Sequence, residues 1–224
     1  MEAMGSQRAA EPAGTAGRWD RAARGYPVSP GLSAHGAGAL AGGADAVRTV
    51  HLLGSTGSIG TQTADIVRAN PSKFRVTGLA ARAADGASLT KLLEQVAQLQ
   101  PDVVAVADVT AADAVRQASP GVEVIVGPDA AAQLAQRPVD VSLNALAGAA
   151  GLPCTVAALA AGSVVALANK ESLVVGGALV TSLAGAGQLV PVDSEHSALA
   201  QCLWAGTRDE VARLVLTEIG RAHV

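Results

Sequence analysis

The sequence predicts an α/β fold with a Rossmann-like, mostly parallel sheet and helices on both faces. Three observations predict it. From residue 47 onward, short β-branched runs alternate with helical stretches, the strands are apolar throughout, and a glycine-rich turn joins the first strand to the first helix. Alternating strands and helices are typical of parallel sheets with crossover helices. Strands buried on both faces form continuous apolar runs, as these do.

Seven strands are expected in chain order, each an apolar run bounded by turn residues. They are 47–53, 74–80, 102–107, 122–126, 139–143, 163–168 and 189–192. The first helix is expected from Ile59 to Asn70, because Pro71 disfavours helix in the residue before it. A second is expected from Leu89 to Leu99, and further helices between the later strands.

The amino-acid composition excludes several classes of protein. With 50% apolar and only 16% charged residues, the 224-residue chain is not globally disordered. A net charge of −3 gives no basic footprint for nucleic acid. The two cysteines, Cys154 and Cys202, make neither a disulfide framework nor a zinc site, so we place them on helix faces. They indicate a reduced, cytoplasmic compartment.

One uncharged stretch, from Val141 to Ala168, is long enough to span a bilayer. Asn144, Gly151, Pro153 and Gly162 interrupt it, so we expect strand, turn, helix, turn and strand instead. The start of the chain lacks an apolar run after a basic region, which argues against a secretory signal.

Gly54, Gly57 and Gly60 form a G-x-x-G-x-x-G turn between the first strand and the first helix. In dinucleotide fingerprints, such glycines permit a tight turn, backbone approach to a pyrophosphate and close packing of helix on strand. Free N–H groups at the helix start favour phosphates, and Thr56 and Ser58 add hydroxyl donors. The turn predicts a dinucleotide site, with a purely structural turn as the alternative.

The end of the second strand favours NADPH over NADH. An NAD site usually has Asp or Glu there to bind the ribose hydroxyls, whereas this sequence reads Leu79-Ala80-Ala81-Arg82. An arginine suits a 2′-phosphate. Asp85 follows closely, and a solvated loop position for Arg82 stays open.

Polar clusters follow two later strands, at the edge where open α/β sheets bind ligands. The first is Asn169-Lys170-Glu171-Ser172. Its lysine could hold a substrate oxygen or phosphate and its amide could touch a nicotinamide ring. The cluster could also be only a helix cap.

The second cluster contains Asp193 and Glu195, followed by His196, which we place at a helix start. The two acids are two residues apart, so they share a face only if the backbone is extended. Converging carboxylates would bind a hard divalent cation. Taken alone, the D-x-E pattern is more often surface charge.

Four segments, in this order, resemble one enzyme family. They are Gly-Ser-Thr-Gly-Ser-Ile-Gly at 54–60, Asn-Ala-Leu-Ala-Gly-Ala-Ala-Gly-Leu at 144–152, Ala-Asn-Lys-Glu-Ser-Leu-Val at 168–174 and Pro-Val-Asp-Ser-Glu-His at 191–196. Together they resemble 1-deoxy-D-xylulose 5-phosphate reductoisomerase. The resemblance covers about residues 47–217 and corresponds to the amino-terminal portion of that enzyme.

The resemblance implies an NADP-dependent oxidoreductase of non-mevalonate isoprenoid biosynthesis. Such an enzyme rearranges 1-deoxy-D-xylulose 5-phosphate and reduces the resulting aldehyde with NADPH, which yields 2-C-methyl-D-erythritol 4-phosphate. A divalent cation (Mg, Mn or Co) acts as a Lewis acid on the substrate carbonyl. The protein orients the hydride donor. The resemblance also implies a homodimer and a small phosphorylated sugar as partner, with no nucleic acid and no membrane.

By similarity, the site residues divide according to what they bind. The cofactor contacts would be Thr56, Gly57, Ser58, Ile59, Asn169 and Glu171. Lys170, Ser194 and Glu195 would bind substrate, Asp193 and Glu195 would be metal ligands, and Lys170 and Glu195 would serve in catalysis. Arg82 stands where many relatives carry glycine, so the adenosine-ribose contacts are left open.

Composition and the resemblance together suggest how the chain divides. Residues 1–46, dominated by Arg, Gly, Ala, Pro and Ser, are expected to be a disordered extension or upstream sequence translated from a wrongly chosen start. The resemblance implies that 47–190 form an NADPH-binding Rossmann-like domain and that 191–217 are the truncated start of an α+β catalytic, metal-binding domain. Residues 218–224 read Glu-Ile-Gly-Arg-Ala-His-Val, which a common sequencing adapter can encode, so we expect an artefactual tail. A third metal carboxylate, a substrate-phosphate site and a mobile loop would lie beyond, so we expect the 224 residues alone to be inactive.

Two alternatives share the glycine turn. One is another NADP-dependent dehydrogenase, of the semialdehyde or homoserine type, which a requirement for a divalent cation would separate. The other is a non-catalytic nucleotide-sensing module, in which alanine variants of Asp193 and Glu195 would behave normally.

Overall fold

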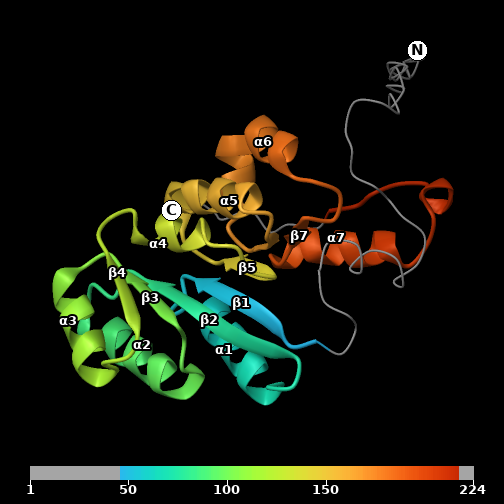
Figure 1. The fold of residues 1–224 in the computed structure, drawn as a ribbon. Coiled ribbons are helices and arrows are strands. Elements are labelled where there is room, and N and C mark those ends of the chain that lie inside the picture. The colour runs from blue at the N-terminus through green and yellow to red at the C-terminus, as the bar shows by residue number, and fades with distance from the viewer. Residues whose placement is uncertain (1–45, 217–224) are drawn as a thin grey trace, which may run out of the picture.

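A seven-stranded sheet in the order β4-β3-β2-β1-β5-β6-β7 forms the centre of the protein (Figure 1). The structure is a computed structural model that describes residues 46–216. Each strand pair along the sheet is parallel, which confirms the predicted fold class. The strands are β1 Arg48–Leu53, β2 Phe74–Ala81, β3 Val103–Val106, β4 Glu123–Val126, β5 Val141–Asn144, β6 Val164–Leu167 and β7 Leu189–Pro191. The predictions for residues 1–45 and 218–224 lie outside the described residues.

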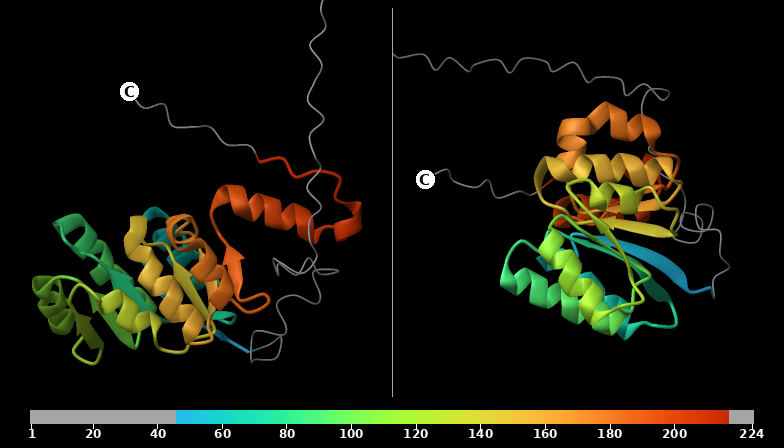
Figure 2. Two further views of the ribbon diagram at one scale, coloured as in Figure 1. Left: turned by 90° about the horizontal axis from the view of Figure 1, so that it is seen from above. Right: turned by 60° about the vertical axis from the view of Figure 1, so that its left-hand side comes forward.

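Helices cover both faces of the sheet (Figures 1 and 2). One face carries α1 Ser58–Ala69, α2 Gly86–Leu99 and α3 Val109–Ala118, and the other carries α4 Ala130–Ala135, α5 Gly151–Ala160 and α6 Glu171–Leu183. The sequence did not locate α3 and α4. A signal for α3 was present, because Asp108 caps it by accepting the N–H groups of Thr110 and Ala111 at 2.8 and 3.1 Å.

The strand order creates a switch point between β1 and β5. From β1 the chain builds β2, β3 and β4 outward on one side, and α4 then carries it back to β5 on the other side. At this point Leu53, the last residue of β1, pairs with Asn144, the last residue of β5. Open α/β sheets bind their ligands outside the carboxyl ends of the strands at such a switch point.

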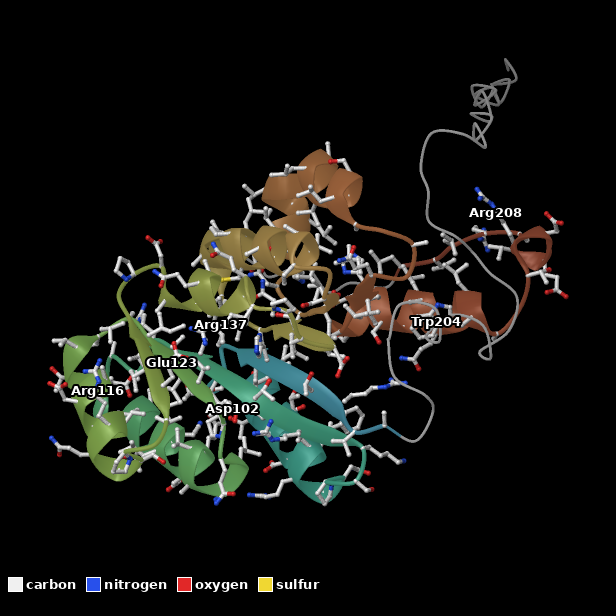
Figure 3. The ribbon with its side chains drawn as sticks, viewed as in Figure 1. Asp102, Arg116, Glu123, Arg137, Trp204 and Arg208 are labelled. Carbon is white, nitrogen blue, oxygen red and sulfur yellow. The ribbon has the colours of Figure 1, made fainter. Side chains whose placement is uncertain are left out.

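The uncharged stretch from Val141 to Ala168 forms β5, the short 3-10 helix η1 (Gly148–Ala150), α5 and β6, as predicted. Among the described residues, no helix combines the length and the apolar character needed to cross a membrane. Beyond β7, helix α7 (Ser194–Trp204) and the 3-10 helix η2 (Arg208–Glu210) follow. None of the α7 residues is buried, and Trp204 at its end lies away from the sheet (Figure 3).

A buried histidine lies on β1 among apolar neighbours. His51 is 4% exposed, and a Cβ on Gly78 of the adjacent strand would come within 2.7 Å of its ring. Its Nδ1 and the Oγ of Ser142 are buried without a partner in the described part of the chain. Burial, followed by the positive charge of Arg137, lowers the pKa of His51 from 6.5 to about 4, against an opposing effect of Asp102. Figure 3 labels Arg137, Asp102 and Glu123, with which Arg137 forms an ion pair.

We expect Gly60→Ala to destabilise the fold by about 3 kcal/mol, the upper end for overpacking. A Cβ at Gly60 would lie 2.3 Å from the carbonyl oxygen of Gly54 and 2.6 Å from that of Ser55, and backbone cannot move aside as a side chain can. Urea unfolding measures the effect. The control is Gly86→Ala at the start of α2, where a Cβ meets nothing within 4 Å and a gain of up to about 1 kcal/mol is expected. Equal stability of both variants would refute the packing argument.

We also expect stability to fall on acidification because of His51. Above pH 6.5 the histidine is neutral in both states and its contribution is fully present. Between pH 6.5 and about 4 the unfolded chain binds a proton that the folded chain does not, so the free energy of unfolding falls as the pH drops. The slope from this one group approaches about 1.4 kcal/mol per pH unit.

Urea unfolding of the unaltered chain and of His51→Gln between pH 7.5 and 4.5 isolates this slope, because glutamine does not titrate. The control is His196→Gln, which removes an exposed histidine on α7. If His51→Gln leaves the pH dependence unchanged, His51 is not the group responsible.

Candidate functional site

The glycine turn after β1 is built by close backbone contacts. Gly54 has φ +84, and its N–H and that of Ser55 both donate to the carbonyl of Ala80, at 2.8 and 2.9 Å. A Cβ on Gly54 would lie 2.6 Å from the carbonyl oxygen of Ala145 after β5. The predicted tight turn at Gly54 and close packing at Gly60 are therefore both present. They hold the start of α1 against the switch point.

The N-terminus of α1 is open. Gly57 occupies the N-cap position without a side-chain hydrogen bond, and the first turn contains no acidic residue. Gly57 and Ser58 are exposed, while Thr56 and Ile59 are half-buried. The N–H of Gly57 donates to the carbonyl of Gly54 at 3.1 Å, so it is not available to a ligand. Gly57 instead lets a ligand approach the backbone closely, because it carries no side chain. The helix start beyond it keeps the orphan N–H groups and the positive dipole end that bind anions.

A buried hydrogen-bond network joins the ends of β5 and β6 to α5 and α6. Asn144 donates through Nδ2 to Thr155 Oγ1 at 2.8 Å, Thr155 donates to Ser172 Oγ at 3.0 Å, and Ser172 Oγ bonds to Asn169 Oδ1. These four residues are at most 1% exposed. Buried polar groups that satisfy one another hold their elements in one arrangement. Sequence reasoning did not assign Asn144 and Thr155 to this role.

Asn169 is the end point of this network. Its Nδ2 donates to the carbonyls of Leu146 and Gly148 at 2.7 and 2.9 Å and to Glu171 at 3.2 Å. Its Oδ1 accepts the Ser172 N–H at 3.0 Å, which supports the capping interpretation of this cluster. The side chain is 1% exposed, so it braces the loop from inside. Its contact with a cofactor stays a prediction, as does that of the half-buried Glu171.

Asp193 caps α7 and is held by His196. Its Oδ1 accepts the His196 N–H at 3.1 Å and lies 2.6 Å from His196 Nδ1. Helix α7 begins at Ser194, so the segment is not extended there. The extended backbone that the two acids would need to share a face is therefore absent at Glu195, which lies in the first turn of α7. Asp193 is only the last of the groups that lower the pKa of Glu195, after the Glu195 backbone, Ser194 and Lys170. His196 starts a helix as predicted.

Lys170 and Glu195 bring the two polar clusters together. The pKa of Glu195 lies below its usual value, first because its own backbone N–H bonds to it, then because of the Ser194 hydroxyl and the charge of Lys170. Lys170 and Ser194 are exposed. The backbone explains this proximity, since Asn169 N–H donates to Asn144 at 3.0 Å and Val192 N–H donates to Leu167 at 2.9 Å. Glu195 is therefore ionised and available to a cation.

The candidate donors for a metal ion are the carboxylates of Asp193 and Glu195 predicted from the sequence. Within residues 46–216, no three His, Cys, Asp or Glu side chains gather into a metal site. Neither cysteine adds to it: Cys154 is buried on α5, where burial raises its thiol pKa to about 11, and Cys202 is exposed on α7.

Known proteins of one enzyme family are similar to this chain in sequence. The sequence profile of a family described as 1-deoxy-D-xylulose 5-phosphate reductoisomerase matches residues 50–177. Curated proteins of that name are similar to this chain, with 57% identity over 172 residues in Rhodococcus jostii and 54% over 180 residues in Mycobacterium marinum. These alignments cover 76% and 80% of this chain but 42% and 43% of the relatives. The chain thus spans about two fifths of the length of the curated relatives it matches.

Solved structures of that enzyme share the fold. The Zymomonas mobilis enzyme in complex with NADPH aligns with a TM-score of 0.63 and 35% identity, over 70% of this chain and 41% of that chain. A DOX-P reductoisomerase in complex with NADPH, fosmidomycin and magnesium aligns with a TM-score of 0.64 and 33% identity, over 70% of this chain and 39% of that chain.

We expect Thr155→Val to cost about 1–3 kcal/mol, because valine keeps the shape but removes the hydroxyl that bonds Asn144 and Ser172. Urea unfolding measures the loss. In Thr90→Val, the matched control, the lost hydroxyl is exposed and bonds only within α2, so a change within about 0.5 kcal/mol is expected. Thr155→Ser should keep most of the stability. A Thr155→Val chain as stable as the unaltered one would refute the role of the network.

Proposed function

This chain belongs to the 1-deoxy-D-xylulose 5-phosphate reductoisomerase family, and on that premise we propose that it supplies the NADPH-binding part and two metal-binding carboxylates of such an enzyme. The enzyme would rearrange 1-deoxy-D-xylulose 5-phosphate and reduce the product to 2-C-methyl-D-erythritol 4-phosphate. Because the chain spans about two fifths of its relatives' length, this activity is proposed for the whole protein, which we expect to be a cytoplasmic homodimer. For the 224 residues alone we propose cofactor binding without turnover.

One observation supports the proposal most: the residues proposed for cofactor, substrate and metal binding all follow the carboxyl ends of parallel strands, at one edge of the sheet. The glycine turn follows β1 at the switch point, Lys170 follows β6, and Asp193 follows β7. The charge of Lys170 already acts on Glu195 across two of these loops. A dinucleotide on the turn would lie along this edge toward Lys170, where hydride transfer needs its substrate.

The loop after β2 favours NADPH as the cofactor. Arg82 follows β2 and is exposed, so its guanidinium is available to a 2′-phosphate. Asp85, the alternative partner for a ribose hydroxyl, caps α2 by accepting the Ser88 N–H at 2.8 Å. One oxygen of Asp85 is thus engaged at the start of α2, while Arg82, the first residue after β2, lies exposed and can meet a 2′-phosphate.

The carboxylates of Asp193 and Glu195 fit a hard divalent cation such as Mg²⁺. Magnesium is commonly held by one or two carboxylates and completes its coordination with water and substrate oxygens. Asp193 keeps a second oxygen beyond the one that bonds His196, and Glu195 has a depressed pKa. Bound there, the cation would act as a Lewis acid on the substrate carbonyl.

The residues of this chain would divide the remaining work. The ammonium group of Lys170 would hold a substrate oxygen, and the hydroxyl of Ser194 would bond a substrate hydroxyl beside Glu195. The network through Asn169 fixes the loop that carries Lys170, which provides the preorganisation that orientation of two reactants requires. NADPH would supply the hydride, and the open start of α1 would hold its pyrophosphate.

We expect Asp193→Asn and Glu195→Gln in the full-length enzyme each to lower kcat by at least about 100-fold, the size typical for loss of one preorganised electrostatic group. NADPH affinity should change less than about twofold, because the glycine turn is untouched. Turnover is followed by NADPH consumption with 1-deoxy-D-xylulose 5-phosphate and Mg²⁺.

The matched control is Asp209→Asn, which removes an acid from η2 outside the proposed site. A nucleotide-sensing module would show normal behaviour in all three variants, and a dehydrogenase of the semialdehyde or homoserine type would need no cation. Either result would overturn the proposed function.

A further inference from the structure

Helix α2 contacts the glycine turn through three polar side chains on one of its faces. Ser88, Lys91 and Gln95 are spaced three and four residues apart, which places them on one side of a helix. α2 lies beside α1 on the same face of the sheet (Figure 1). No contact of this kind follows from the dinucleotide fingerprint itself, since the helix lies about 30 to 40 residues further along the chain.

Each of these side chains bonds to Ser55 or Thr56. Gln95 Nε2 donates to the carbonyl of Ser55 at 2.8 Å, Lys91 Nζ donates to the carbonyl of Thr56 at 3.3 Å, and the hydroxyls of Ser88 and Thr56 lie 3.1 Å apart. Ser55 and Gln95 are buried, at 0 and 5% exposure. The two consecutive carbonyls of the turn are therefore both held from α2.

Holding a carbonyl determines where the next N–H points. In a planar trans peptide the C=O and the N–H of one unit point in opposite directions. Gln95 draws the Ser55 carbonyl inward, so the Thr56 N–H points away from the buried side. Within residues 46–216 that N–H has no acceptor. In the same way, Lys91 bonds to the Thr56 carbonyl and so orients the peptide between Thr56 and Gly57. The Gly57 N–H of that peptide donates to the Gly54 carbonyl and closes the turn.

The polar head of Gln95 has no other hydrogen-bond partner within the described residues. Its Oε1 is buried and unpartnered there, as is the hydroxyl of Ser55 beside it. Burying a polar group without full pairing costs stability. An apolar side chain of the same length would avoid that cost but would leave the Ser55 carbonyl without a donor. The one bond that Gln95 makes is thus the one to the turn.

We propose that Gln95 and Lys91 of α2 are positioning residues for the dinucleotide phosphates, because they orient the Ser55 and Thr56 peptides of the glycine turn. This inference rests on the proposed function, since it requires that the turn binds NADPH. Gln95 and Lys91 act through the backbone of the turn and need not touch the cofactor.

The test compares two α2 variants with two matched controls in the 224-residue chain. Gln95→Met and Lys91→Met keep length and lose the donor. Gln188→Met removes another glutamine that donates to two backbone carbonyls, at 2.8 and 3.1 Å, before β7. Lys73→Met removes an exposed lysine at the start of β2, on the opposite edge of the sheet. Fluorescence titration gives Kd for NADPH, and competition gives Kd for ADP.

We expect Gln95→Met to raise the Kd of NADPH about tenfold and Lys91→Met about threefold to tenfold, as for the loss of one hydrogen bond. ADP should weaken by the same factors, since the turn acts on the pyrophosphate that both ligands carry. The two controls should stay within about twofold. A general loss of stability would not produce this pattern, because Gln188→Met removes three hydrogen bonds, the third being the one that Gln188 Oε1 accepts from the Gly185 N–H.

The other possible outcomes distinguish failure of the proposed function from failure of the inference about α2. If the unaltered chain binds neither NADPH nor ADP, the proposed function of the turn fails. If it binds both and the α2 variants bind as tightly as the controls, this inference fails while the proposed function stands. Circular dichroism checks folding, and if Gln95→Met does not fold, the exposed position of Lys91 makes Lys91→Met the deciding variant.

Discussion

The close approach of two backbone segments at Gly54 and Gly60 is the contact on which the rest of the site depends. A side chain at Gly60 would overlap the carbonyl of Gly54, and one at Gly54 would overlap the carbonyl of Ala145 after β5. Without side chains there, β1, α1 and the β5 loop meet directly at the switch point. The helix dipole of α1 is thereby aimed at the sheet edge where a phosphate would sit.

The opposite half of the same edge is held by hydrogen bonds instead of close packing. The series from Asn144 through Thr155 and Ser172 to Asn169 ties two strand ends to two helices. It leaves Lys170 exposed on the loop that Asn169 holds in place. In the proposed function this fixed placement of Lys170 serves hydride transfer, because misplacement of reacting groups costs rate.

Three charged residues, Lys170, Asp193 and Glu195, lie in or just after the loops that follow β6 and β7. The charge of Lys170 helps to lower the pKa of Glu195 across two loops, and Asp193 is fixed by His196 rather than left as free surface charge. In the proposed function these positions serve substrate and metal binding, and the loops that follow β6 and β7 place them at the same edge of the sheet. The thiol of Cys154 on α5 is buried, and burial raises its pKa to about 11.

The sequence by itself determined the elements and the local chemistry: seven apolar strands, the glycine turn, the start of α7 near His196 and the candidate ligands Asp193 and Glu195. These are local properties, because apolar runs, caps and glycine spacing depend on residues a few positions apart. Only the tertiary structure decided the strand order, the burial of Asn169, the effect of the Lys170 charge on the pKa of Glu195 and the bond from Gln95 to Ser55. Each of those depends on which distant segments pack side by side, and that is set by the summed burial of both faces of the sheet rather than by any one stretch of the chain.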